Sequence, residues 1–158
     1  MILNKKIKHI DKESPIYFWI LAVSFIWIGY VASISFMEAW LKFRAPNITL
    51  SIGLEIGRLV FRALNGVEWC FALIILGLIR KVTSKTLFNN VSLFFFISLG
   101  ILLLQTLWLL PKLDHRAIKI ISGETPEKSF LHVCYIVFEV LKLVGLFSFN
   151  FKLFRKLY

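Results

Sequence analysis

Residues 91–110, VSLFFFISLGILLLQTLWLL, carry no charged side chain, and this stretch decides the fold class. A helix needs about 20 mostly apolar residues to cross the hydrocarbon core of a bilayer. Three further stretches offer a comparable apolar length, at residues 16–37, 59–79 and 130–151. The sequence therefore predicts an all-α fold, a four-helix transmembrane bundle built as a single domain from residues 1–158.

The composition of the whole chain leads to the same conclusion. Of the 158 residues, 58% are hydrophobic and 18% are charged, whereas soluble domains have about 45–50% apolar and about 25% charged residues. The two cysteines and three histidines form no Cys-rich cluster, and the glycines form no phosphate-binding loop. We therefore expect an integral membrane protein, without a metal site or a cofactor, and we exclude a water-soluble enzyme.

Prolines and one glycine predict where the helices begin and end. A hydroxyl residue before a proline suits a first helical turn, because the N–H that proline lacks has no partner there. The expected starts of this kind are Ser14-Pro15 for the first helix and Thr125-Pro126 for the fourth. Pro46 is expected to close the continuation of the first helix and Pro111 to end the third. Gly123 is expected to stop a short amphipathic segment over residues 113–121.

Residues 38–61 do not have the pattern of an ordinary loop. Charged residues in and just after this stretch recur at spacings of three and four, which pair side chains along a helix; the first set is Glu38 and Lys42, and the second is Glu55, Arg58 and Arg62. We expect an interfacial segment in the headgroup layer, with Arg58 and Arg62 in the first turns of the second span. These two arginines either bind an anionic headgroup or substrate or pair locally, with Glu55, Asp114, Glu124 or Glu127 as available partners.

The basic residues predict orientation and partners. The formal net charge is +10, and the basic residues fall mainly in short tracts between apolar runs, which indicates contact with anionic lipid and not with nucleic acid. Ten Lys and Arg lie in the two tails and the central loop, against eight on the opposite face. This predicts both termini in the cytoplasm, in a bacterial cytoplasmic membrane. The expected partners are the lipid bilayer and a second copy of the chain or another membrane protein.

Ionisable residues inside the spans are the candidates for function, because they are costly in lipid and face the bundle interior. Glu68 lies about halfway along the second span, and Glu139 and Lys142 lie near the middle of the fourth. Both helices cross in the same direction, so we expect these three residues at equal depth. Other polar residues recur at helical spacing and form a polar stripe along each of the last three spans. They are Asn65 in the second span, Ser98 and Gln105 in the third, and Tyr135 and His132 in the fourth.

Two interpretations of these intramembrane residues stay open. In the structural one, Glu139 and Lys142 neutralise each other, and Glu68 takes a partner that fixes helix register, namely Arg62, Asn65 or Gln105. In the functional one, the two carboxylates and the ammonium share protons as a proton- or ion-coupled site. A haem site at His132 is not expected, because His9 and His115 lie outside the apolar spans.

Two segments carry a resemblance to a known family. EAWLKFRAP at residues 38–46 and GLEIGRLVFRALN at residues 53–65 resemble small bacterial integral membrane proteins of about this length. LPKL at residues 110–113, followed by His132, is similar to a wider group of four-helix membrane domains of unknown function. The resemblance implies the four-helix fold, and it implies no reaction, cofactor or catalytic residue.

For function, we expect a non-enzymatic subunit or partner-binding membrane module. The alternative is an oligomeric proton- or ion-coupled small transporter that uses Glu68, Glu139 and Lys142. A membrane enzyme is the third class. We expect no enzyme, since the groups near a membrane face form no Ser/His/Asp or Cys/His arrangement; they are Asp114, His115 and His132.

Overall fold

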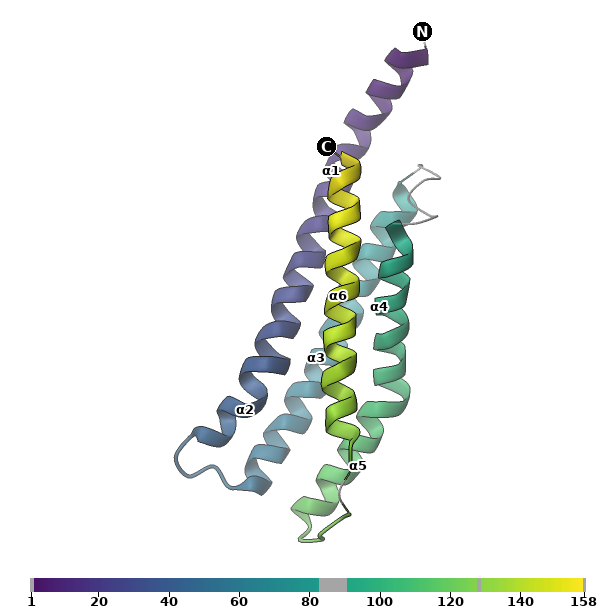
Figure 1. Ribbon diagram of the computed structural model, residues 1–158. Helices are drawn as coiled ribbons and strands as arrows, with labels where there is room; N and C mark the ends of the chain where they lie inside the picture. Colours follow the sequence, from purple (N-terminus) through teal and green to yellow (C-terminus); the bar gives the residue numbers. More distant parts are fainter. Residues whose placement is uncertain (1, 83–90, 128, 158) are drawn as a thin grey trace.

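The computed structural model describes residues 2–82, 91–127 and 129–157, and the elements in these ranges are all helical. In chain order they are α1 (Ile2–Val31), the π-helical η1 (Ala32–Glu38), α2 (Ala39–Leu41), the 3₁₀-helical η2 (Lys42–Arg44), α3 (Leu50–Lys81), α4 (Ser92–Leu104), the π-helical η4 (Gln105–Leu109), α5 (Leu110–Ile121) and α6 (Leu131–Leu157). The segments from α1 to η2 follow one another without a break, as do those from α4 to α5, so the chain forms four long helices (Figure 1).

Each of the four helices is long and apolar enough to cross a membrane. The candidate spans are Pro15–Arg44, Leu50–Lys81, Ser92–Ile121 and Leu131–Arg155. This result confirms the predicted four-helix bundle and identifies an integral membrane protein. At 1.5 Å per residue, helices of 25 to 32 residues are longer than a hydrocarbon core of about 30 Å. Their ends therefore extend into the headgroup layer.

The predicted starts of the first and fourth helices are wrong. α1 begins at Ile2 and contains Pro15, and α6 begins at Leu131. A proline removes one backbone hydrogen bond, yet a helix continues through it where the residues on both sides are helical. Ser129, and not the expected Thr125, caps the start of α6: its Oγ accepts a hydrogen bond from the Leu131 N–H at 3.2 Å.

The prediction that Pro111 ends the third helix is also wrong. Pro111 lies in the first turn of α5, which continues directly from η4. The wider turn of a π-helix changes the backbone hydrogen-bonding pattern ahead of the proline, so the helix passes through it. The amphipathic segment at residues 113–121 and the one after the first span are therefore continuations of membrane helices.

Two predicted helix ends are confirmed. Ala45, before Pro46, adopts an extended conformation with φ −67° and ψ 134°, as a residue before proline prefers. Gly123 has φ 89°, and the backbone N–H groups of Gly123 and Glu124 donate to the carbonyls of Ile120 (3.1 Å) and Lys119 (3.0 Å). These two bonds form a Schellman motif, in which glycine adopts the left-handed conformation without strain.

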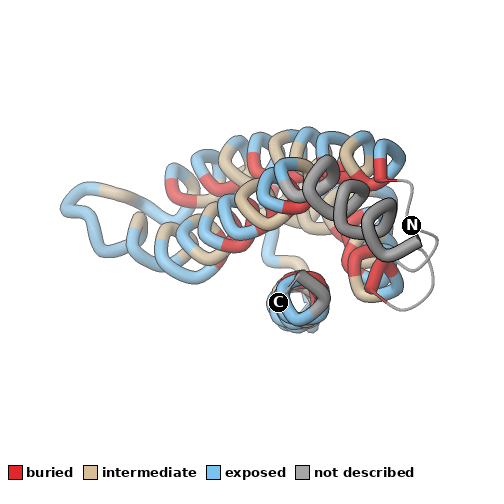
Figure 2. The backbone as a smooth tube through the Cα atoms, turned by 90° about the horizontal axis from the view of Figure 1, so that it is seen from above, coloured by how far each residue is buried: buried red, intermediate tan, exposed pale blue. Residues whose placement is uncertain are grey.

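The interior of the bundle is narrow and aromatic. Trp27 of α1, Phe95 of α4 and Phe149 of α6 are fully buried, and their rings contact in series, with centroids 6.5 and 5.5 Å apart. α6 packs against α1 and α4, while α3 packs against α1 and α5. Seen along the bundle, buried positions lie on the inward faces of the helices and exposed ones on the outside (Figure 2). Many exposed side chains are large and apolar, as a surface in contact with lipid requires.

Candidate functional site

Polar side chains from all four helices meet near the middle of the bundle. We call this group the Lys142 cluster; it consists of Trp27, Glu68, Gln105, Glu139 and Lys142. The Lys142 Nζ lies 2.5 Å from Glu68 Oε1 and 3.1 Å from Glu139 Oε2, and it donates to Gln105 Oε1 at 2.8 Å. The ammonium is fully buried and contacts both carboxylates and the Gln105 amide oxygen.

Each carboxylate of the Lys142 cluster also accepts a hydrogen bond from a neutral donor. Trp27 Nε1 donates to Glu68 Oε1 at 2.9 Å, and Gln105 Nε2 donates to Glu139 Oε1 at 3.1 Å. All five side chains belong to buried residues. Two carboxylates face one ammonium, so the cluster carries a net charge of −1 when both glutamates are ionised. A buried charge without a counter-charge is costly in a low-dielectric interior. The unusual feature of this site is therefore that it buries one more carboxylate than ammonium.

The structure confirms part of the predicted intramembrane pairing and corrects another part. Glu68, Glu139 and Lys142 do lie at the same depth, and Glu139 does pair with Lys142. The partners that the structural interpretation expected for Glu68, namely Arg62, Asn65 or Gln105, are wrong: it binds Lys142, as the functional interpretation grouped them, and Trp27. Sequence reasoning did not single out Trp27 as a partner. Its position halfway along the first span, away from the interfaces where tryptophan is common, was the available signal.

The other polar residues expected on these stripes have distinct partners. Ser98 is buried, and its Oγ donates to the Lys142 carbonyl at 3.1 Å, which joins α4 to α6. Asn65 Nδ2 donates to Thr106 Oγ1 at 2.9 Å, and Trp69 Nε1 donates to the same oxygen at 2.9 Å. Asn65 therefore links α3 to η4, beside the Lys142 cluster and not within it.

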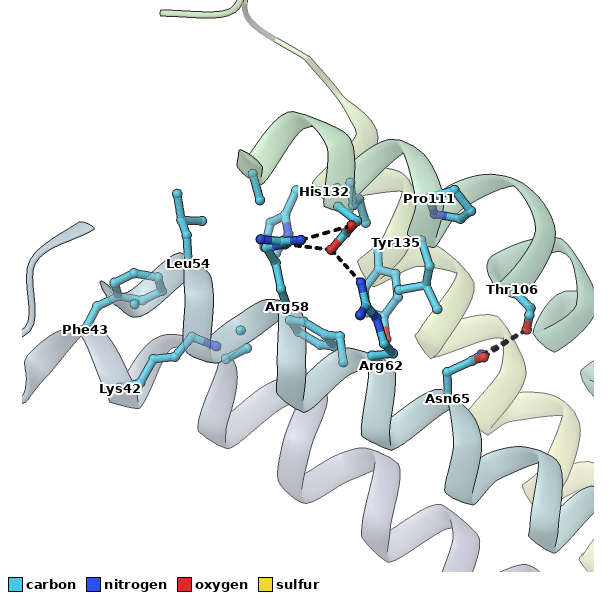
Figure 3. Close-up of a pocket in the computed structure, with 18 residues that line it drawn as sticks. Lys42, Phe43, Leu54, Arg58, Arg62, Asn65, Thr106, Pro111, His132 and Tyr135 are labelled. Atoms are coloured by element: carbon cyan, nitrogen blue, oxygen red, sulfur yellow. Dashed lines mark hydrogen bonds and ion pairs between the residues drawn. The ribbon is translucent and has the colours of Figure 1, made fainter. Parts of the chain in front are cut away.

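The chain forms a cavity of about 450 Å³ (Figure 3). Among the elements that line it are α2 and α5, which lie at the end of the bundle opposite the chain termini (Figure 1). We call it the α3–α5 cavity, because these two helices supply most of its lining, with smaller parts from α2, η2, η4 and the start of α6. Asn65 and Thr106 lie at one end of the cavity, Lys42 and Phe43 lie at the other, and Arg58 and Arg62 lie between them (Figure 3). His132 and Tyr135 of α6 also line it.

The middle of the α3–α5 cavity is lined by a three-residue ion-pair cluster of Arg58, Arg62 and Asp114. Arg58 contacts Asp114 with two nitrogens, Nε to Oδ1 at 2.6 Å and Nη2 to Oδ2 at 3.2 Å. Arg62 Nη2 reaches Asp114 Oδ1 at 3.3 Å. Of the local partners considered for these arginines, Asp114 is the one that the structure brings to both. One carboxylate cannot neutralise two guanidinium groups, so this cluster retains one positive charge.

The cavity approaches the Lys142 cluster closely. Asn65 precedes Glu68 by three residues on α3, and Tyr135 precedes Glu139 by four residues on α6, so each lining residue lies about one helical turn, or roughly 5 Å, from a buried carboxylate. Tyr135 is itself buried, and its side chain is close enough to Glu139 to interact with it. In the described ranges, no group of three or more His, Cys, Asp and Glu residues could hold a metal ion.

The chain was compared with known proteins in three ways. No protein-family model, curated protein or solved structure matches it. The resemblance to small bacterial four-helix membrane proteins therefore stays a prediction.

Proposed function

We propose that this protein is a proton-coupled membrane carrier, with the Lys142 cluster as its proton-binding site and the α3–α5 cavity as the route to it. The observation that carries the proposal is the pair of buried carboxylates, Glu68 and Glu139, on a single ammonium (2.5 and 3.1 Å) beside a cavity. An ion pair that only fixes the helix register needs one carboxylate and one ammonium. A second buried carboxylate is not required for that role.

The charge balance defines the chemical step. A proton that arrives through the α3–α5 cavity binds one carboxylate of the Glu68–Glu139 pair, which becomes a carboxylic acid, and the net charge of the cluster changes from −1 to 0. Release of the proton restores the carboxylate. We take Lys142 as the counter-charge in both states, because its Nζ contacts both carboxylates and donates to Gln105 Oε1. An ionisable group that alternates between two charge states in lipid is the usual element of a proton relay.

The direct test is an infrared measurement on the wild-type protein. A cluster that shares one proton gives a carbonyl stretch from a carboxylic acid at neutral pH, where exposed carboxylates are ionised. We expect this band in the wild type and its loss or shift in Glu68→Gln and Glu139→Gln. Glu55→Gln is the matched control, since Glu55 is an exposed residue of α3 and its removal leaves the band in place. A wild-type spectrum without the band overturns the proposal.

Proton flux into proteoliposomes tests whether the Lys142 cluster carries protons. We expect the wild type to acidify the lumen under a potassium diffusion potential, and each of the two Gln variants to reduce that rate at least tenfold while Glu55→Gln does not. Circular dichroism and gel filtration check that the variants are folded. Undiminished flux in both Gln variants contradicts the carrier proposal.

We propose a bacterial cytoplasmic membrane with both termini in the cytoplasm, as the excess of Lys and Arg at the terminal end favours. Both termini lie at the same end of the bundle (Figure 1), so the α3–α5 cavity faces the opposite side. The test places one cysteine at Ala45 after both native cysteines, Cys70 and Cys134, are replaced by serine. We expect labelling of intact cells by a membrane-impermeant maleimide; protection from the reagent contradicts this orientation.

The sequence-based expectation of a non-enzymatic subunit stays a prediction, and so does the expectation that the chain is not an enzyme. The mass of the detergent-extracted assembly separates a subunit from a carrier. A homo-oligomer supports the carrier, and a different protein in stoichiometric amount supports the subunit.

A further inference from the structure

Arg62 has N–H donors without a partner beside the α3–α5 cavity. Arg58 contacts Asp114 through two nitrogens, whereas Arg62 contacts it through one. A guanidinium has five N–H donors, and the Arg62 side chain is 69% exposed, so most of its donors are available to an anion. Lys42 adds no net charge, because its Nζ lies 3.2 Å from both carboxylate oxygens of Glu38. Asp114 and Glu55 both act electrostatically on Arg58, so the positive charge that is open to an anion is that of Arg62.

Other parts of the cavity lining are apolar and partly aromatic. Phe43, Leu54, Phe61 and Leu113 line the cavity. Its volume of about 450 Å³ falls in the range of about 300–1,000 Å³ for sites that hold small organic molecules. A site of this size and lining is larger and less polar than an inorganic anion requires. It matches a molecule with an apolar body and one charged end.

The depth of the site also favours an amphipathic ligand. Arg58 precedes Glu68 by ten residues on α3, which places it about 15 Å along the helix from the Lys142 cluster. Half of a hydrocarbon core is also about 15 Å, so Arg58 lies at the boundary between lipid and headgroups. Arg62 precedes Glu68 by six residues, about 9 Å along the helix, which places it roughly 6 Å inside that boundary. A ligand whose anionic group contacts both arginines has its charge near the headgroup level and its apolar body among side chains.

We infer that the α3–α5 cavity binds an organic monoanion, a single carboxylate or phosphodiester on an apolar body, with the anionic group on Arg62 and Arg58. As an assignment of binding, this inference stands on the cavity alone. As the identity of the solute that is carried, it rests on the proposed function.

The experiment is a calorimetric titration of the wild-type protein in phosphatidylcholine nanodiscs, with empty nanodiscs as the blank. The probe is phenylacetate, and its neutral matched control is phenylacetamide. We expect saturable binding of phenylacetate at least tenfold tighter than that of phenylacetamide. The absence of saturable phenylacetate binding overturns the inference, and so does equal affinity for the two compounds.

Two arginine variants separate the site from the general surface potential. Arg62→Gln removes the excess charge and is expected to weaken phenylacetate binding at least tenfold. Arg116→Gln removes the same charge from α5, outside the cavity and in a separate open groove, and is expected to change the affinity less than twofold. Equal losses in the two variants contradict a specific site. Asp114→Asn raises the local charge and is expected to tighten binding.

Anionic lipid and free solute are distinguished by a second set of nanodiscs that contain phosphatidylglycerol. A tenfold drop in phenylacetate affinity in the wild type identifies a lipid as the occupant, and an unchanged affinity identifies a free organic acid. Failure of the proposed proton carrier is recognised separately, with the Glu68→Gln variant. Glu68 does not line the cavity, so this variant is expected to bind phenylacetate as tightly as the wild type, whatever its proton flux.

Discussion

Replacement of Lys142 by methionine tests the charge arrangement at the centre of the bundle. The substitution keeps a long unbranched side chain and removes the ammonium. Glu68 and Glu139 then lose contacts of 2.5 and 3.1 Å, and Gln105 Oε1 loses a donor at 2.8 Å. Two carboxylates are left in a site where the side chains are at most 2% exposed, without a cation among the groups that contact them.

The expected loss of stability is large. Removal of one partner from a buried ion pair costs about 3–5 kcal/mol, because it leaves an uncompensated buried charge. For a chain of 150–250 residues, each kcal/mol lowers the melting temperature by about 2–4 °C, so the expected decrease is on the order of 6–20 °C. Lys152→Met is the matched control on the same helix. Lys152 is exposed and lies over the Phe94 ring at 4.2 Å, which is worth about 0.5–1 kcal/mol.

Thermal unfolding in a mild detergent, followed by circular dichroism, measures both variants. A third protein, with Lys142→Met, Glu68→Gln and Glu139→Gln together, has no charge at the site. We expect it to recover most of the lost stability, since replacing a whole buried ionic group is often close to neutral. A Lys142→Met protein that melts like the Lys152→Met control refutes the reasoning. A triple variant as unstable as Lys142→Met refutes it as well.

Four further predictions concern packing, backbone geometry and the hydrogen bonds of the site. Gly145→Ala places a methyl group against the Ser98 side chain and 3.3 Å from the Phe94 carbonyl oxygen, so we expect a loss of about 1–3 kcal/mol in a denaturant titration; Gly100→Ala, which has open space around it, is the control and is expected to be neutral or slightly stabilising. Gly123→Ala introduces a side chain at φ 89° and is expected to cost about 1–2 kcal/mol, with faster amide exchange in the last turn of α5 as the local readout; unchanged exchange contradicts the Schellman assignment. Trp27→Phe removes the N–H donor to Glu68 at 2.9 Å, a hydrogen bond to a charged group expected to contribute about 1.5–3 kcal/mol, whereas Trp19→Phe at an exposed position is expected to leave the melting temperature unchanged. Asp114→Asn breaks a partly exposed ion pair and is expected to cost at most about 1 kcal/mol, a difference that disappears in 1 M salt, where the screening length is about 3 Å; a loss that persists at high salt indicates a packing effect.

Several features of the fold follow from short stretches of sequence, because their causes are local. Residues 91–110 need lipid around them whatever the rest of the chain does, since their apolar length is a property of the stretch itself. Pro46 and Gly123 act on the backbone of their immediate neighbours, and both helix ends form as predicted. Counting residues along each span also gives the depth of a side chain, so the equal depth of Glu68 and Lys142 was predictable.

The helix boundaries that sequence reasoning missed depend on more than the nearest residues. Pro111 satisfies a rule for helix ends, yet the π-helical turn at Gln105–Leu109 lets the helix continue through it to Ile121. Thr125 satisfies a rule for helix starts, yet α6 begins only where the apolar residues begin, at Leu131. At Thr125, a capping preference of about 1 kcal/mol is too small to decide where a helix starts.

The sequence by itself determined that this chain has four membrane helices and that Glu68, Glu139 and Lys142 lie at mid-depth, because length, polarity and spacing are read along one dimension. Only the tertiary structure decided which side chains meet. Glu68 binds Lys142 and Trp27 instead of its neighbours on α3, and Asp114 joins Arg58 and Arg62 at the edge of a cavity. These contacts depend on the rotation of each helix about its axis, which is set by the packing of all four helices together.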